Sequence, residues 1–376
     1  MNSTQRVFVV GAGLFGSVIA ERFAAHGVPV VVLEKRNHIG GNCASEFEPE
    51  TGIEVHSYGS HIFHTSDQTV WDYIRRFTDF NSYQHHVEIK VGEQIYPMPI
   101  SLATINAFFR KAFSPAEARD FIFSELHKME INNLEDKAIS LIGNSLYQAF
   151  IKGYTEKQWG KKATELPADI ITRLPVRFNY NTRYFADTYE GVPLDGYGAL
   201  FKKLLADPLI EVKLNCDFME ERKNIPDDAL IVYTGEIDRY FNYSCGHLEY
   251  RYVRFEKEIH NLPDYQGNSV VNYGDTSVPF TRIHEFRHYH PERAYGDKTV
   301  IYKEFSTDGS AGGEVAYPVH TVENKAVFSQ YQKLAEAEKN VVFGGRLASY
   351  RYWDMDDTIA AALACFDECS KRWNFC

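Results

Sequence analysis

Short apolar runs on either side of a glycine-rich turn dominate the start of the chain. Val7–Val10 and Val30–Leu33 are continuous apolar runs rich in valine. Such runs are typical of strands that a parallel sheet buries on both faces. Between them, apolar residues recur at helical spacing, at Phe15, Val18, Ile19 and Phe23. The pattern predicts a strand, a turn, a helix and a second strand over residues 6–34.

The remaining chain alternates between helical and strand-like patterns. Residues 102–154 are predicted to be mostly helical, with one helix over Ala138–Tyr154. Ser114 and Glu117, with Pro115 between them, form the signature of a helix N-terminus. The other predicted elements are a hairpin of Val87–Val91 and Gln94–Tyr96 that ends at Pro97 and Pro99, strands at Leu209–Leu214, Ala229–Thr234 and Asn340–Phe343, antiparallel strands within Tyr250–Tyr317, and a helix from about Asp356 to Ser370.

The turn after the first strand, Gly11 to Gly16, has the glycine spacing of a dinucleotide-binding turn. Gly11 permits a tight bend, Gly13 lets backbone approach a pyrophosphate, and Gly16 lets the helix pack closely on the strand. Glu34 ends the second strand, where an acid is expected to bind a ribose 2′-OH. An acid at this position favours NAD or FAD over NADP.

A second glycine pair follows this unit. Arg36 precedes the segment Gly40-Gly41-Asn42. A basic residue followed by paired glycines resembles a flavoprotein pattern in which a second backbone segment wraps FAD. The segment therefore favours FAD over NAD, and the alternative is an ordinary glycine loop.

The composition excludes several classes of protein. The 376 residues suffice for two or three domains. A net charge of −11 argues against nucleic-acid binding, although a local arginine cluster can still bind an anion. A membrane span and a signal peptide are not expected, because the chain has neither pattern. The six cysteines are scattered, which favours free thiols in a cytoplasmic protein.

Three histidines lie close together at His56, His61 and His64. Their spacing fits no standard zinc site, and no cysteine or carboxylate follows at ligand distance. The sequence predicts a loop near a cofactor at this point and no metal site.

Later motifs resemble those of one enzyme family. They are Gly153–Gly160 (GYTEKQWG), Thr172–Tyr180 (TRLPVRFNY), Pro279–Ile283 (PFTRI), Ala316–Pro318 (AYP) and Gly345–Asp356 (GRLASYRYWDMD). Together with the N-terminal pattern, they resemble the bacterial UDP-galactopyranose mutases over essentially the whole chain. Agreement in the order of unrelated motifs is far more specific than the glycine turn alone.

The predicted elements and the resemblance indicate an α/β fold. We expect a discontinuous Rossmann-like FAD-binding domain with an inserted helical domain and an antiparallel β-sheet domain. The FAD-binding domain would comprise residues 1–85, 201–244 and 321–376. The sheet domain would comprise residues 86–100, 172–200 and 245–320, and the helical domain, with a mobile lid, residues 101–171. The family is often dimeric, so a homodimer is expected.

Members of this family interconvert the six-membered and five-membered ring forms of UDP-galactose. The resemblance implies FAD that is reduced by NAD(P)H or another reductant and is then used without net redox change. Flavin N5 attacks the anomeric carbon and displaces UDP, and the covalent flavin–sugar adduct opens through an iminium. The sugar recloses through its other hydroxyl and UDP returns. The expected enzyme is an isomerase of galactofuranose biosynthesis.

The resemblance also implies site residues. Arg173 and Arg282 match arginines that contact the diphosphate, and guanidinium forks suit phosphate oxygens. With His61, beside the flavin, and Asp354, near the substrate, they are the candidate catalytic residues. The remaining substrate-binding residues are aromatic: Phe150, Tyr154 and Trp159 toward the uridine, and Tyr184, Tyr317 and Tyr352 around the diphosphate. The cofactor-binding residues are Gly11, Gly13, Phe15, Gly16, Glu34, Lys35, Gly41, Asn42, His61, Arg346, Asp354 and Met355.

Simpler roles remain open for several of these residues. An arginine can form a surface salt bridge, a tyrosine can pack in a core, and Asp354 can cap a helix. The chain also departs from the family pattern at two positions. Ile151 stands where a second adjacent aromatic is expected, and Gly59-Ser60-His61 replaces Gly-Pro-His. Serine leaves this loop freer than proline would.

Other functions remain alternatives. A mutase could act on UDP-N-acetylgalactosamine or on a dTDP-linked 6-deoxyhexose. An FAD oxidoreductase of the amine-oxidase type shares the nucleotide fold, but two arginines and many tyrosines suit a diphosphate better than an amine. A third class is a protein that binds a UDP-sugar or senses redox state without catalysis.

Overall fold

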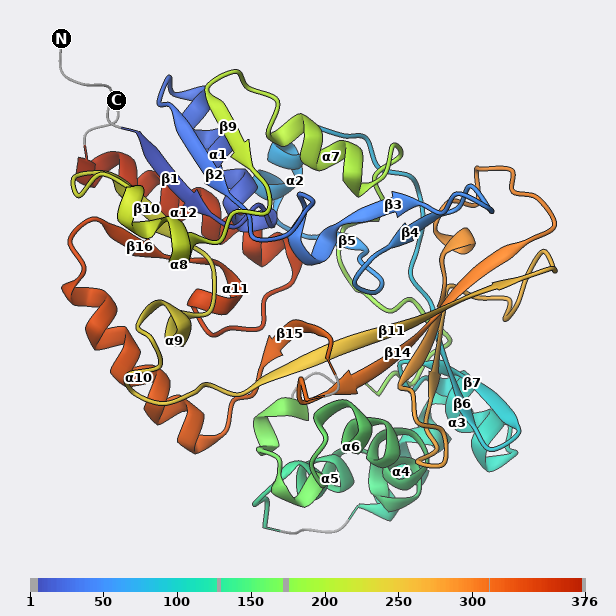
Figure 1. Cartoon of the computed structure of the whole chain (residues 1–376). Coiled ribbons are helices and arrows are strands. Elements are labelled where there is room, and N and C mark those ends of the chain that lie inside the picture. The colour runs from blue at the N-terminus through green and yellow to red at the C-terminus, as the bar shows by residue number, and fades with distance from the viewer. Residues whose placement is uncertain (1–5, 127–129, 172–175, 311, 374–376) are drawn as a thin grey trace.

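Two large sheets organise the protein, which is described here from a computed structural model covering residues 6–126, 130–171, 176–310 and 312–373. One sheet has five parallel strands and the other has seven strands of mixed direction. Figure 1 shows the parallel sheet at one end of the molecule and a group of helices at the other, with the long strands β11 and β14 running between them.

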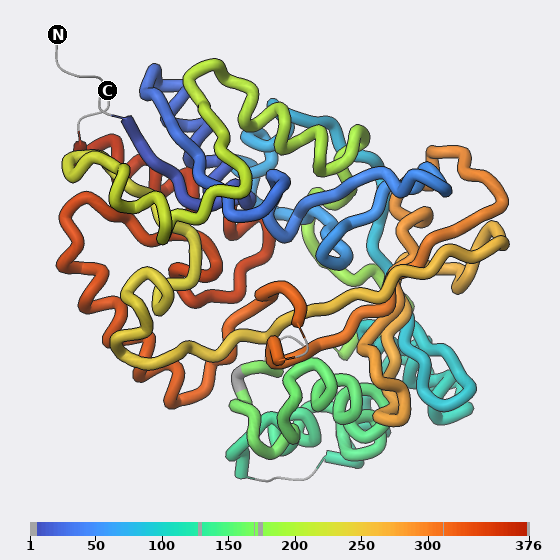
Figure 2. Tube along the Cα trace, in the orientation of Figure 1, coloured from blue at the N-terminus to red at the C-terminus, as the bar shows by residue number. Residues whose placement is uncertain are grey.

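The parallel sheet has the strand order β16-β10-β1-β2-β9. Its strands are Val341–Phe343, Leu230–Tyr233, Val7–Val10, Val30–Leu33 and Ile210–Lys213. They come from widely separated parts of the chain, and Figure 2 shows the segment with β9 lying beside the N-terminal segment. The predicted discontinuous Rossmann-like fold is therefore confirmed.

Helices cover both faces of this sheet, because its strands are apolar on both sides. Valines such as Val9 and Val32 face a core shared with three helices, α1 (Leu14–Ala25), α7 (Tyr197–Leu204) and α12 (Met355–Trp373). Val31 and Leu33 point the other way, since successive residues of a strand alternate between its faces. There they pack with the short helices α8 (Phe218–Glu221) and α9 (Ile237–Tyr240).

The second sheet has the order β15-β11-β14-β13-β12-β6-β7. In that order its strands are Glu314–Pro318, Tyr250–His260, Thr299–Thr307, Arg282–Glu285, Val270–Tyr273, Val87–Val91 and Gln94–Met98. The predicted antiparallel sheet is confirmed, with one pair that departs from it, because β12 and β6 are parallel. A long connection joins these two strands, so no hairpin forces them to run in opposite directions.

The hairpin prediction also needs one correction. Strand β7 continues through Pro97 to Met98 instead of stopping before the proline. This is possible because β7 is the edge strand of the sheet, where a residue without an N–H group leaves no hydrogen bond unmade.

The helical region packs against strands β6, β7 and β12 around a shared apolar core. Its elements are α3 (Leu102–Phe109), α4 (Pro115–Glu125), α5 (Leu134–Leu146), the π-helical turn η2 (Tyr147–Lys152) and α6 (Gly153–Trp159). The predicted capping box of Ser114 and Glu117 is present. The single helix predicted over Ala138–Tyr154 is not. Gly143 adopts a φ of +77° inside α5, and η2 widens the helix before α6.

Smaller elements complete the chain. They are β3 (Ser45–Phe47), β4 (Glu54–His56), β5 (Phe63–Thr65), β8 (Tyr189–Gly191), α2 (Gln68–Ile74), α10 (Val322–Ala337), α11 (Gly345–Ala348) and the 3₁₀ turns Gly41–Cys43, Ala163–Glu165, Ala168–Ile171, Arg222–Asn224 and Phe286–Tyr289. Of the helices in the described ranges, none combines the length and apolar character needed to cross a membrane.

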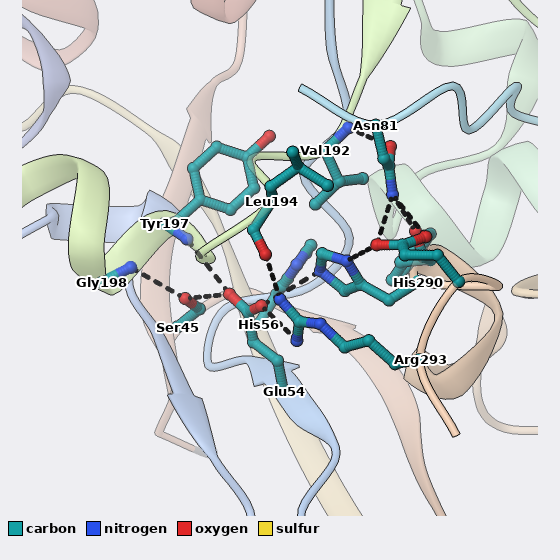
Figure 3. Close-up of polar contacts among 12 residues, drawn as sticks. Ser45, Glu54, His56, Asn81, Val192, Leu194, Tyr197, Gly198, His290 and Arg293 are labelled. Atoms are coloured by element: carbon teal, nitrogen blue, oxygen red, sulfur yellow. Dashed lines mark hydrogen bonds and ion pairs between the residues drawn. The ribbon is translucent and has the colours of Figure 1, made fainter. Parts of the chain in front are cut away.

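A buried carboxylate ties the parallel-sheet region to the second sheet (Figure 3). Glu54 on β4 accepts hydrogen bonds from the Ser45 hydroxyl at 2.6 Å and the Tyr197 N–H at 3.1 Å. His290 and Arg293 lie 3.1 and 3.3 Å from its Oε2. Burial raises the pKa of Glu54, but these partners outweigh it and lower the pKa to about 2. The two regions are therefore joined by a charge that stays ionised.

Candidate active site

One cavity of ≈ 910 Å³ draws its walls from both sheets and from the helical region. Its volume lies near the upper end for small-molecule sites, about 300–1,000 Å³. All twelve predicted cofactor residues line it. So do most of the described substrate candidates, namely Phe150, Tyr154, Trp159, Tyr184, Arg282 and Tyr352. Arg173 lies outside the described residues, and Tyr317 is absent from the wall.

The glycine turn forms one end of the cavity, where backbone segments approach too closely for side chains. A Cβ atom on Gly16 would lie 2.0 Å from the Gly11 carbonyl oxygen, and Gly11 itself has a φ of +102°. A Cβ atom on Gly41 would lie 2.8 Å from Gly13 Cα. The second glycine pair therefore packs directly on the first turn. Together they form a backbone cradle of the kind that fits a dinucleotide pyrophosphate.

Glu34 closes this end of the cavity and is only 5% exposed. Its Oε2 accepts the Ala12 N–H at 2.8 Å, and its Oε1 accepts the Arg36 N–H at 2.8 Å. A carboxylate has about four lone-pair sites, so acceptor capacity remains for ribose hydroxyls. The neighbouring Lys35 lies at the rim, 3.7 Å from Glu236. These contacts fit the ribose of a bound dinucleotide.

His61 lies further along the cavity, on the loop between β4 and β5. Its N–H donates to His56 Nδ1 at 3.0 Å, and its own Nδ1 lies 2.8 Å from the Gly59 carbonyl oxygen. Burial lowers the pKa of His61 to about 4, even though the contact with Gly59 raises it. The imidazole is therefore neutral at physiological pH.

Arg346 reaches the same part of the cavity from α11. Its Nη2 donates to the Ala316 carbonyl at 2.8 Å, and its guanidinium lies over the Tyr352 ring at 5.2 Å. Within the described ranges, its buried Nε has no hydrogen-bond partner. An unpaired donor in a cavity wall fits a polar ring of a bound cofactor. Asn42 supports this region by donating to the Val315 carbonyl at 2.9 Å.

Asp354 and Met355 line the cavity at the start of α12. The N–H and hydroxyl of Thr358 donate to the Asp354 carbonyl at 3.1 and 2.8 Å. The backbone of Asp354 thus begins the helix, while its carboxylate role in catalysis stays a prediction.

Arg282 supplies a fixed positive charge at the other end of the cavity. It projects from β13 with its side chain 26% exposed, and its Nη2 donates to the Tyr154 hydroxyl. Its Nε lies 3.3 Å from Glu304 Oε1. Burial lowers the pKa of Arg282, but Glu304 and Tyr154 raise it above its ordinary value. The guanidinium is therefore always charged, as a site for a diphosphate requires.

Aromatic side chains form the wall around this charge. Trp159 meets Tyr317 edge-on with ring centroids 5.3 Å apart, and Tyr317 meets Tyr352 at 5.8 Å. The Tyr317 hydroxyl donates to the Gln158 carbonyl at 3.3 Å. Tyr317 thus contacts both Trp159 and Tyr352, and its predicted role at the diphosphate stays a prediction. Ile151 lines the cavity where a second aromatic was expected.

Sequence reasoning missed several residues of this region. Glu304 and Asn272 are cross-strand partners of Arg282 on β14 and β12. Their positions follow from strand register, for which the sequence carries no local signal. His85 also lines the cavity, and burial lowers its pKa to about 3. In the sequence, the available signal for His85 was its position just before the predicted strand Val87–Val91.

Comparisons with known proteins agree with this geometry. A family model described as UDP-galactopyranose mutase matches residues 149–352, and a model of NAD(P)-binding Rossmann-like domains matches residues 9–77. A Klebsiella pneumoniae protein named probable UDP-galactopyranose mutase is 41% identical, over 97% of this chain and 95% of its own. The chain belongs to the UDP-galactopyranose mutase family. It is therefore a nucleotide-sugar mutase, an isomerase, and the family and fold imply a flavin cofactor.

Two further comparisons refine this assignment. An Escherichia coli dTDP-fucopyranose mutase is 38% identical, over 96% of this chain and 97% of its own. A crystal structure of reduced UDP-galactopyranose mutase superimposes with a TM-score of 0.74 at 15% identity, covering 98% of this chain and 96% of that one. The structural match supports the fold, and the family supports the mutase class.

Proposed function

We propose that this protein interconverts UDP-galactopyranose and UDP-galactofuranose with reduced FAD as its cofactor. The observation that carries the proposal is the placement of Arg282. Its charged guanidinium stands in the same cavity as the glycine cradle and the neutral His61. A mutase needs this combination, because the anomeric bond breaks next to the flavin while a diphosphate departs with negative charge.

The cofactor end has the residues to hold FAD. The backbone of Gly11–Gly16 and Gly41 would receive the pyrophosphate, and Glu34 the adenosine ribose. His61, Arg346 and Met355 would surround the flavin. When bound, the reduced flavin supplies a nucleophilic ring nitrogen and electron density. The reductant would be NAD(P)H or another donor.

The substrate end has the residues to hold a nucleotide diphosphate. Arg282, with Arg173 from outside the described ranges, would bind the diphosphate and stabilise the charge that develops on it. Tyr184 and Tyr352 would add hydroxyl donors. Burial raises the pKa of Tyr154 far above the physiological range, so its phenol stays protonated and can donate. Phe150 and Trp159 would contact the base, since aromatic faces suit a uracil ring.

A second candidate substrate is a dTDP-linked 6-deoxyhexose. The 38% identity to a dTDP-fucopyranose mutase favours it as the runner-up, because the two relatives are almost equally similar to this chain. A related UDP-N-acetylgalactosamine mutase activity is a further alternative. An amine-oxidase activity is disfavoured by the arginine and tyrosines at the substrate end.

A panel of nucleotide-sugars tests these alternatives. Purified protein loaded with FAD is reduced with dithionite, incubated with each nucleotide-sugar, and the products are separated by chromatography. We expect UDP-galactofuranose to convert to UDP-galactopyranose faster than the dTDP-6-deoxyhexose converts, without net electron consumption. Faster turnover of the dTDP-sugar would select the runner-up. Turnover of an amine with oxygen, without mutase activity, would contradict both.

Three further expectations carry over as proposals. The FAD-binding domain comprises residues 1–85, 201–244 and 321–376, the sheet domain 86–100, 172–200 and 245–320, and the helical domain 101–171 with its lid. The protein forms a homodimer, and it is located in the cytoplasm.

A further inference from the structure

Ser60 stands at the junction of two parts of the site. It precedes His61 on the loop at the flavin end, and its hydroxyl contacts Nδ1 of His284 on β13. It also accepts a hydrogen bond from the Tyr289 hydroxyl. Tyr289 and His284 are both almost completely buried. This serine occupies the position where the family pattern has proline, which could make neither contact.

His284 extends the contact toward the substrate end. Its Nε2 lies 2.9 Å from Glu304 Oε2, and Glu304 Oε1 lies 3.3 Å from Arg282 Nε. The Thr281 hydroxyl donates to the same Oε1 at 3.1 Å. Both oxygens of Glu304 are therefore engaged, Oε2 with His284 and Oε1 with the Thr281 hydroxyl. Oε1 also forms an ion pair with Arg282 that is not a hydrogen bond.

The hydrogen positions in the contacts from Tyr289 to Glu304 follow from the chemistry of the groups involved. Burial lowers the pKa of His284 although Glu304 raises it, so the imidazole carries one proton. Burial raises the pKa of Glu304, but Arg282 and His284 outweigh it and lower it to about 2, so Glu304 is an anion. His284 Nε2–H then donates to Glu304, and Nδ1 must accept from Ser60. Tyr289 donates to the Ser60 oxygen, which completes an uninterrupted series of donors.

We propose that Ser60, His284 and Glu304 are positioning residues that fix the orientation of the Arg282 guanidinium from the flavin-side loop. The inference rests on the proposed diphosphate-binding role of Arg282. A carboxylate held in place by His284 and Thr281 attracts the guanidinium from one fixed direction, which lowers the entropy lost when a diphosphate binds. Ser60 supplies the donor that holds His284 in the tautomer this requires.

The test compares threonine and valine at position 60. Ser60→Thr and Ser60→Val have the same shape and differ only in the hydroxyl. The dissociation constant of UDP is measured by calorimetry on each FAD-loaded protein, together with FAD affinity. We expect the Val variant to bind UDP about two- to tenfold more weakly than the Thr variant, the range for one hydrogen bond, with FAD affinity unchanged. If either variant fails to fold, Ser60→Ala against the unmodified protein provides the same comparison.

A second measurement asks whether the effect passes through Glu304. The Thr and Val variants are combined with Glu304→Gln, which removes the ion pair with Arg282. We expect the difference in UDP affinity between Thr and Val to fall below about 1.5-fold, because coupled residues are not additive. If the difference in UDP affinity between Thr and Val persists in the Glu304→Gln background, the proposal is overturned. Equal UDP binding by the Thr and Val proteins would also overturn it. Failure of the unmodified protein to bind UDP would instead contradict the proposed function.

Discussion

The two ends of the cavity are built in different ways. The cofactor end is made mainly of backbone from residues 7–42, where glycines remove side chains and Glu34 holds the turn by accepting two backbone N–H groups. The substrate end is made of side chains from distant segments. Arg282 comes from β13, Tyr154 from α6, and Tyr352 from the segment after α11.

This difference has a chemical reason. A pyrophosphate that is bound permanently can be held by fixed backbone N–H groups, which need only a correct local conformation. A diphosphate that leaves and returns needs a full counter-charge on a side chain, and a partly buried cation must be balanced by a partner such as Glu304. The cofactor end therefore tolerates little change in shape, whereas the substrate end is sensitive to charge.

The largest expected effect comes from charge at the substrate end. Replacing Arg282 with alanine is expected to lower kcat by about 10²–10³-fold, because one charge-stabilising donor is lost. Arg282→Lys keeps the charge that balances Glu304 but loses the fork, so a smaller loss is expected. Steady-state kinetics with reduced enzyme measures both.

Arg254 provides the matched control, on strand β11 of the same sheet. It forms a half-exposed ion pair with Glu256 at 2.7 Å and does not line the cavity. Arg254→Ala should leave kcat within about twofold, since surface ion pairs contribute little. Equal losses in the Arg254 and Arg282 variants would show that the substrate end is not defined by its charge.

The next effect comes from shape at the cofactor end. A Gly16→Ala side chain would lie 2.0 Å from the Gly11 carbonyl oxygen, so the turn must shift. Overpacking of this kind costs about 1–3 kcal/mol, which corresponds to a roughly five- to 150-fold loss of FAD affinity. The measurement is a titration of the apoprotein with FAD.

Gly27 is the control for this substitution. It lies in the same strand–helix–strand unit with a φ of +77°, but a Cβ atom there would meet nothing within 4 Å. Gly27→Ala should lower stability through backbone strain while FAD affinity is retained. A Gly27 variant that lost FAD as completely as the Gly16 variant would contradict the role assigned to the cradle.

A third expected effect is on pH-dependent stability, and it leaves activity and binding at neutral pH unchanged. Burial lowers the pKa values of His56 and His85 to about 3, so the folded protein does not protonate them between pH 6.5 and 4. The unfolded chain does, and stability therefore falls with falling pH by roughly 1.4 kcal/mol per pH unit for each histidine. Glu54 also loses its stabilising contribution on acidification, but only below about pH 4.5.

Urea unfolding across this pH range checks the prediction. His56→Asn should reduce the slope of unfolding free energy against pH by roughly 1.4 kcal/mol per unit between pH 6 and 4. The matched control is His26→Asn, because His26 is exposed. An unchanged slope in the His56 variant would show that this imidazole is protonated in the folded state.

Local features of the fold were predictable from the sequence. The strand–turn–helix–strand unit, the capping box at Ser114 and the hairpin at β6 and β7 each depend on residues a few positions apart. The parallel pairing of β6 with β12 was not predictable, because it joins residues nearly two hundred positions apart, as Val87 and Val270 show. The π-helical turn after Gly143 was also missed, since its apolar spacing looks like that of an ordinary helix.

The candidate site divides in the same way. The family motifs identified Arg282, Tyr154 and Trp159, and the structure places all three on the cavity wall. Glu304 and His284 had no motif of their own. They matter only because the register of β13 and β14 sets Glu304 opposite Arg282, and because Ser60 reaches His284 across the loop.

Positional isotope exchange tests the central claim most directly. UDP-galactopyranose with a heavy-oxygen label in the bond between the sugar and the β-phosphate is incubated with FAD-loaded protein, and the label position is followed by ³¹P NMR. If the anomeric bond breaks while Arg282 retains the diphosphate, the label will scramble into non-bridging positions with dithionite-reduced protein, and far more slowly with Arg282→Ala. Conversion of the sugar ring without scrambling would contradict the account.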